Sequence, residues 1–103
     1  MWALVMFDLP VMTKKQRNAA NGYRHMLQDD GFIRIQLSVY AKYFINGTGL
    51  VATAGRLKTN LPPGGLVRLL KLTDAQWLKT VRIEHVVGGD PKPEEPPPAL
   101  LLF

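Results

Sequence analysis

The chain has 103 residues, of which 47% are apolar, and a formal net charge of +5 at pH 7. This length suits one small domain with a core, and the positive charge indicates an anionic partner, most simply nucleic acid. The absence of cysteine excludes disulfides and thiolate zinc sites, and His25 and His85 lack the spacing of metal ligands. No apolar stretch reaches membrane-spanning length and no signal-peptide pattern is evident, so we expect a soluble cytoplasmic protein.

Residues 2–7 form a short run that is apolar on both faces and stops at Asp8, two residues before Pro10. Such a run is typical of a central strand that is covered on both faces of its sheet. A single layer of helices covers only one face, so a second copy of the chain is the simplest cover for the other. Asp8 by itself fits the start of a turn before Pro10.

Thr13 is a good N-cap and Gly31 a good stop, which predicts a helix between them. One helical face is apolar and consists of Ala19, Ala20, Tyr23, Met26 and Leu27. The opposite arc is polar and consists of Lys14, Arg17, Asn21, Arg24 and His25. Charge on an outer helical face commonly serves solvation alone.

Residues 32–44 alternate with the period of a strand. One face is apolar and consists of Ile33, Ile35, Leu37, Val39, Ala41 and Tyr43. The other face consists of Arg34, Gln36, Ser38, Tyr40 and Lys42. One long strand and a hairpin bent near residues 36–38 both fit this pattern, and Tyr43 is expected in the core.

Turn residues at 46–49 precede a second amphipathic helix, which ends at the Pro and Gly residues 62–65. Its apolar positions are Leu50, Val51, Ala54, Leu57 and Leu61. Residues 66–72 predict another strand. The capping-box spacing of residues 73–76 predicts one helical turn, with Trp77 in the core.

Residues 81–87 read as a further strand. We therefore predict an α+β ferredoxin-like βαββαβ sandwich in domain 1–87, forming a homodimer. Residues 88–98 are rich in Gly and Pro and predict a linker. The apolar residues 99–103 then predict an extra C-terminal strand, which joins a sheet edge across the dimer or at a partner protein.

Four segments together resemble the CRISPR-associated Cas-two family. They are VMFDLP (5–10), TKKQR (13–17), GFIRIQLSVYAKYF (31–44) and LVRLLKLTDAQW (66–77). The FDLP and TKK phrases are most similar to members from type II systems. The resemblance implies a ferredoxin-like homodimer that bridges dimers of the Cas-one integrase and binds duplex prespacer DNA during spacer acquisition.

The resemblance also implies a set of site residues. The acidic residue that ends the first strand is Asp8, which is expected to bind a divalent metal, Mg²⁺. The family's basic positions in the first helix and second strand fall on Arg17 and Arg34. Its S-V-F/Y positions fall on Ser38 and Tyr40. Together these five residues are the candidate catalytic set.

A sequence-independent, salt-sensitive interaction with phosphates is expected from the basic residues. The candidates are Lys14, Lys15, Arg17, Arg24, Arg34 and Lys42. Mg²⁺ often needs only one or two carboxylates, and one Asp8 from each copy could supply them. No second carboxylate and no general base lie nearby in sequence, so a single chain cannot build a two-metal nuclease site, which weakens the hypothesis of catalysis. The sequence leaves open whether a metal-dependent endonuclease activity exists and whether its substrate is RNA or DNA.

Two alternatives remain at this point. One is a free-standing, toxin-like metal-dependent endoribonuclease. The other is a non-catalytic RNA-binding ferredoxin-like domain, which the pattern favours less because exposed stacking aromatics are not evident.

Overall fold

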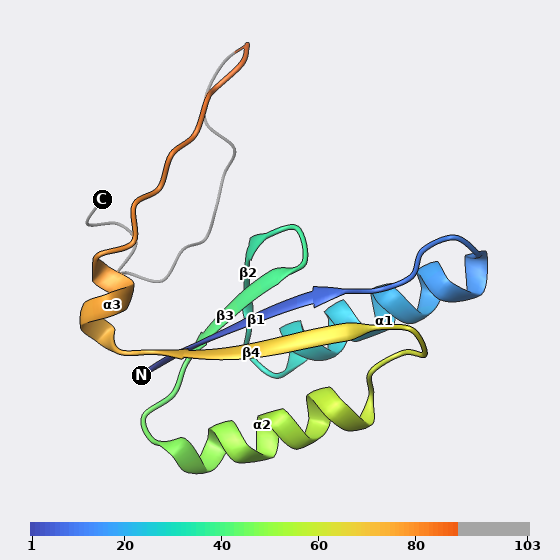
Figure 1. The fold of residues 1–103 in the computed structure, drawn as a ribbon, viewed down its shortest axis with the longest axis horizontal. Coiled ribbons are helices and arrows are strands. Elements are labelled where there is room, and N and C mark those ends of the chain that lie inside the picture. The colour runs from blue at the N-terminus through green and yellow to red at the C-terminus, as the bar shows by residue number, and fades with distance from the viewer. Residues whose placement is uncertain (89–103) are drawn as a thin grey trace.

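Residues 1–88, which the computed structural model describes, contain one four-stranded sheet and three helices (Figure 1). The elements are β1 (Trp2–Asp8), α1 (Lys14–Asp29), β2 (Ile33–Gln36), β3 (Val39–Tyr43), α2 (Gly47–Thr59), β4 (Leu66–Leu72) and α3 (Asp74–Leu78). All strand pairs are antiparallel and the order is β2-β3-β1-β4. This confirms the α+β βαββαβ plan, with the apolar β1 in the centre.

The helix boundaries follow the predicted capping signals. At the start of α1 the Thr13 Oγ1 atom accepts from the Gln16 amide at 3.1 Å, and Gln16 Oε1 accepts from the Thr13 amide at 3.0 Å. The chain leaves the end of α1 through Gly31, whose φ of +92° suits glycine. Thr73 and Gln76 form a second capping box at α3.

Residues 32–44 form a hairpin, which decides between the two conformations that the pattern allowed. The helices α1 and α2 cover the face of the hairpin that contains Tyr40, although the sequence pattern marked that face as polar. Tyr40 is 1% exposed, and its ring stacks on Phe7 with centroids 5.8 Å apart. Tyr43, which was expected in the core, lies on the opposite face and is 47% exposed. The prediction for Tyr43 was wrong because alternation separates two faces without showing which one is covered.

The main core lies between the sheet and the two long helices. Alternate β1 residues Ala3, Val5 and Phe7 pack there with side chains from both α1 and α2. The Tyr23 hydroxyl donates to the Leu57 carbonyl oxygen at 2.8 Å and so joins α1 to α2.

The inner face of α2 also differs from the expectation. Val51 was expected in the core but is 76% exposed, whereas Thr53 is 1% exposed. Thr53 lies on the face of Leu50 and Leu57, and its hydroxyl oxygen accepts from Arg56 Nη2 at 3.2 Å. A hydroxyl satisfied in this way is tolerated in the core.

The opposite face of the sheet is only partly covered. Trp77 of α3 is buried as predicted and stacks on Trp2, with ring centroids 5.1 Å apart. Further along this face, Leu66 and Leu70 of β4 remain 47% and 45% exposed.

Residues 81–87 are not a strand in the structure, and this prediction was wrong. The chain leaves the sheet after α3 (Figure 1), and Ile83 and Val87 are 90% and 86% exposed. A strand needs a neighbour for its backbone hydrogen bonds, and these residues have none within residues 1–88.

Two predicted segments, the linker beyond Gly88 and the strand at 99–103, lie outside the described residues. Within residues 1–88, no helix has the length and apolar character that crossing a membrane requires.

Candidate metal and nucleic-acid site

Asp8 is the last residue of β1, and its side chain is exposed. It borders a shallow pocket of about 180 Å³ at the end of the sheet. The lining residues are Met6, Phe7, Asp8, Leu37, Ser38, Val39 and Leu66. The carboxylate of Asp8 is therefore accessible beside a mostly apolar surface.

The turn of the β2–β3 hairpin brings Ser38 to this pocket. Ser38 has a φ of +65°, which is uncommon for a residue other than glycine. In this conformation its carbonyl oxygen accepts from the Phe7 amide at 3.1 Å. The structure thus places two predicted site residues, Asp8 and Ser38, around one pocket.

Tyr40 lies beneath this region, in the core. Its ring is enclosed against Phe7, which also meets Tyr23 edge to face at 5.7 Å. Tyr40, a member of the candidate catalytic set, therefore offers no exposed face to a ligand and instead supports the strand that carries Asp8.

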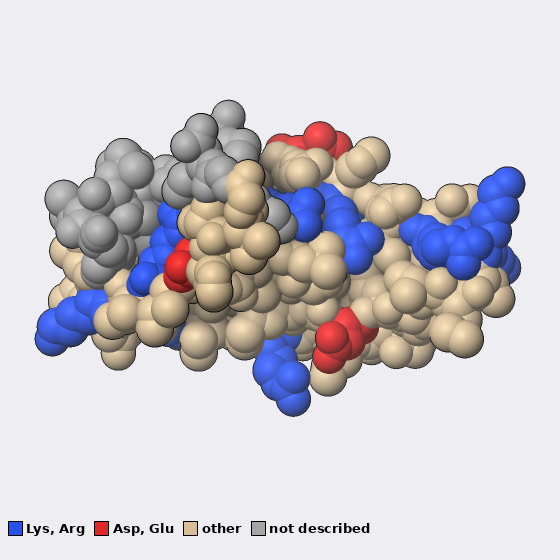
Figure 2. Space-filling model, turned by 90° about the horizontal axis from the view of Figure 1, so that it is seen from above, with Lys and Arg blue, Asp and Glu red and all other residues tan. Residues whose placement is uncertain are grey.

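Three of the predicted basic residues gather where β1 passes into α1. Lys14, Lys15 and Arg17 are exposed, and the first turn of α1 contains no acidic residue. Figure 2 shows Lys and Arg side chains grouped at the end of the molecule that corresponds to this junction in Figure 1. A phosphate bound at this end would not be repelled by a carboxylate in the first turn of α1.

Arg17 is also bound within the chain. Its Nη1 atom donates to the carbonyl oxygens of Val11 at 3.2 Å and Met12 at 3.3 Å. The guanidinium therefore holds the β1–α1 connection in place.

Arg24 and Arg34 lie further along the molecule. The Arg24 guanidinium carbon is 5.7 Å from the centroid of the Phe7 ring, and its buried Nε has no hydrogen-bond partner among residues 1–88. Arg34 is exposed on β2, in register with Tyr40 on β3.

Lys42 belongs to a different environment. Its ammonium group donates to the Asp30 carbonyl oxygen and lies 5.0 Å from the ring centroid of Phe44. This interaction stabilises the C-terminal end of α1, where a cation is favourable. The structure therefore separates Lys42 from the basic residues at the β1–α1 junction.

The donor chemistry at Asp8 fits Mg²⁺ when two copies contribute. Among residues 1–88, no three His, Cys, Asp or Glu side chains come together as a metal site. Asp30 is engaged elsewhere, because it accepts from Arg56 Nε at 2.7 Å. Since Mg²⁺ retains several waters and needs few carboxylates, one Asp8 from each of two chains would suffice.

A family model described as CRISPR associated protein Cas2 matches residues 1–80. The chain belongs to the Cas2 family. This is the Cas-two family that its motifs resemble.

Several Cas2 relatives resemble this chain over most of its length. A protein of Paracidovorax avenae named CRISPR-associated endoribonuclease Cas2 is 40% identical over 81 residues, which cover 79% of this chain and 75% of the relative. A protein of the same name from Parvibaculum lavamentivorans is 36% identical over 104 residues and covers both chains completely. The crystal structure of Streptococcus pyogenes Cas2 at pH 6.5 has a TM-score of 0.66 at 21% identity, covering 82% of this chain and all of that one, and so supports the Cas2 fold.

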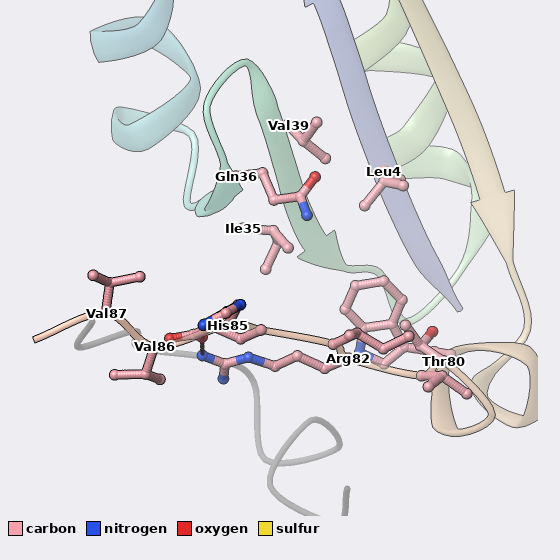
Figure 3. Close-up of a pocket in the computed structure, with 13 residues that line it drawn as sticks. Leu4, Ile35, Gln36, Val39, Thr80, Arg82, His85, Val86 and Val87 are labelled. Carbon is pink, nitrogen blue, oxygen red and sulfur yellow. Dashed lines mark hydrogen bonds and ion pairs between the residues drawn. The ribbon is translucent and has the colours of Figure 1, made fainter. Parts of the chain in front are cut away.

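Sequence reasoning missed a larger cavity on the outer face of the sheet. This cavity of about 840 Å³ lies between the sheet and residues 80–87. In Figure 3, Leu4, Ile35 and Val39 extend from the strands, and Arg82 and His85 lie across from them. The apolar alternation of residues 33–39 was the available signal, but it was assigned to the core.

Proposed function

We propose that this Cas2 protein acts in spacer acquisition, in a type II CRISPR system, as a homodimer that bridges Cas-one integrase dimers and holds duplex prespacer DNA. The observation that carries the proposal is the presence of two distinct surfaces on one small domain. One is the incompletely covered apolar face of the sheet, and the other is the basic end at the β1–α1 junction.

The apolar face supports the dimer. Leu70 is opposite Leu4 in the β1–β4 register, and both lie on the face that the two long helices leave open. Covering a large apolar side chain contributes about 1.5–3 kcal/mol, so several such residues favour association. A second copy carries the same surface and would cover it symmetrically.

The basic end supports duplex binding. Lys14 and Lys15 project from the first turn of α1, and Arg24 and Arg34 add charge from α1 and β2. Because phosphates are present in every sequence, binding through these side chains is expected to depend on salt and not on base sequence. Arg17 contributes charge and also fixes the adjacent backbone.

A second candidate function, metal-dependent endonuclease activity, is favoured by the accessible carboxylate of Asp8 and by the endoribonuclease names of the relatives. Asp8 from each of two copies would hold the Mg²⁺, with Ser38 beside it. The ion would supply charge neutralisation and water activation for phosphodiester hydrolysis. The Arg34 side chain is exposed and makes no hydrogen bond within the described residues, so its donors are available for a phosphate.

The C-terminal segments complete the proposal. We assign residues 88–98 as a linker and residues 99–103 as an added strand at a sheet edge, across the dimer or at the integrase. Strand addition supplies main-chain hydrogen bonds without requiring a folded domain.

Co-purification tests the function. The tagged protein is expressed with the Cas-one integrase of the same locus, and captured complexes are then mixed with duplex DNA and measured by light scattering. We expect capture of the integrase and a complex containing two copies of this chain. The variant Lys14→Glu/Lys15→Glu should retain the integrase but lose DNA. Failure of the wild-type protein to capture the integrase would contradict the proposal.

A further inference from the structure

The β1–α1 connection presents two apolar side chains to solvent at the basic end of the molecule. Met12 is 86% exposed and Val11 is 49% exposed. They immediately precede Lys14 and Lys15, which are also exposed. A single exposed apolar residue is ordinary, so the surroundings of this pair decide its meaning.

Helix capping does not explain the apolar side chain of Met12. An apolar residue directly before an N-cap commonly contacts the fourth residue of the helix, in a hydrophobic staple. Here the N-cap is Thr13 and the fourth helical residue is Arg17, while Met12 remains exposed. The thioether side chain therefore has no packing role inside the described chain.

The backbone beneath Met12 is held from both sides. Arg17 Nη1 donates to the Val11 and Met12 carbonyl oxygens, and Gln16 Oε1 accepts from the Met12 amide at 2.9 Å. On the preceding side, Leu9 packs against the core. A segment fixed in this way loses little conformational entropy when it binds a ligand.

The charge around this segment selects the kind of ligand. Two lysines follow the apolar tip, and α1 has no acidic residue in its first turn. An apolar tip with cationic flanks suits a duplex, because the minor groove has phosphates on both sides and its base steps accept apolar side chains, including methionine.

We propose that Met12 inserts into the minor groove of a bound DNA duplex as an apolar wedge while Lys14 and Lys15 bind the flanking phosphates. This inference rests on the proposed DNA-binding function. It makes Arg17 a positioning residue, which acts by holding the Met12 backbone.

The test uses a duplex that contains 2-aminopurine, whose fluorescence rises when its base step is unstacked. Affinity is measured at several salt concentrations with the full-length protein. Met12→Ser should bind about ten-fold more weakly with an unchanged salt slope, because the lost contact is apolar. It should also lose the 2-aminopurine response at saturation.

Two further variants separate the roles of charge and positioning. Lys14→Gln/Lys15→Gln should lower the salt slope by about one for each lysine and retain the fluorescence response at saturation. Arg17→Gln should reduce that response, which the loss of one phosphate contact alone would not do.

Ile45→Ser is the matched control. Ile45 is 91% exposed in the β3–α2 connection, so this variant removes a similarly exposed apolar side chain from another part of the molecule. It should leave both affinity and fluorescence unchanged.

The outcomes are distinct. If Met12→Ser behaves like Ile45→Ser, the wedge is refuted while DNA binding stands. If Met12→Ser weakens only integrase capture, the segment contacts protein, and the inference is also refuted. A wild-type protein that binds no duplex at any salt concentration would instead overturn the proposed function itself.

Discussion

Replacing Tyr23 by phenylalanine removes one oxygen atom from the interface between α1 and α2. The Tyr23 side chain is 3% exposed, and its hydroxyl donates to the Leu57 carbonyl oxygen at 2.8 Å. Leu57 lies in the last turn of α2, where carbonyl oxygens lack partners within the helix. Tyr23→Phe therefore leaves a buried carbonyl without its donor, and we expect a loss of about 1–3 kcal/mol in the free energy of unfolding.

The same residue predicts a dependence on alkaline pH. Burial raises the pKa of Tyr23 from 10.0 to about 12 in the folded protein. Between these two values the unfolded chain releases the proton while the folded chain retains it. The unfolded state then binds fewer protons, so the free energy of unfolding falls as pH rises above 10. Below pH 10 the contribution of Tyr23 is fully present.

Urea unfolding followed by tryptophan fluorescence measures both effects, because Trp2 and Trp77 stack in the folded state. Wild type and Tyr23→Phe are compared at pH 7 and pH 10.5, and the difference between their free energies of unfolding should shrink at the higher pH. Tyr43→Phe is the control, since Tyr43 is 47% exposed, and it should change stability little. Equal midpoints for wild type and Tyr23→Phe at pH 7 would refute the reasoning, as would a constant difference across the two pH values.

Four other substitutions have expected outcomes. Gly55→Ala should raise the free energy of unfolding by about 0.5–1 kcal/mol, because a Cβ there meets nothing within 4 Å in α2. Gly65→Ala should lower it, because its Cβ would lie 3.0 Å from the Pro62 carbonyl oxygen, which is backbone, as well as 2.8 Å from Leu9 Cδ2. Urea unfolding measures both changes. Asp8→Ala should abolish any Mg²⁺-dependent cleavage of labelled RNA or DNA while light scattering still shows a dimer; unchanged cleavage would place the activity elsewhere. Leu70→Lys should give monomers in light scattering, whereas Val51→Lys, which changes an exposed residue of α2, should leave the dimer intact. If both variants remained dimeric, an interface on the open sheet face would be contradicted.

The sequence alone determined the features that depend on neighbouring residues, and those that several motifs together identify through the family. The capping boxes at Thr13 and Thr73 each involve residues three positions apart, so the surrounding fold does not alter them. The apolar β1 required a central position, because an edge strand would expose both its backbone and one face. Asp8 at the end of that strand was identified through the family motif, and its exposure agrees with a binding role.

Only the tertiary structure decided which alternating face was covered and which groups found partners. Tyr40 is enclosed and Tyr43 exposed because α1 and α2 pack on one side of the sheet, which period-two alternation cannot specify. Residues 81–87 have strand-like composition, yet a strand forms only beside another strand, and α3 carries the chain away from the sheet. Arg17 was a candidate for catalysis and phosphate binding, but its Nη1 atom also donates to the carbonyl oxygens of the preceding loop, and this contact depends on how the chain folds back before α1.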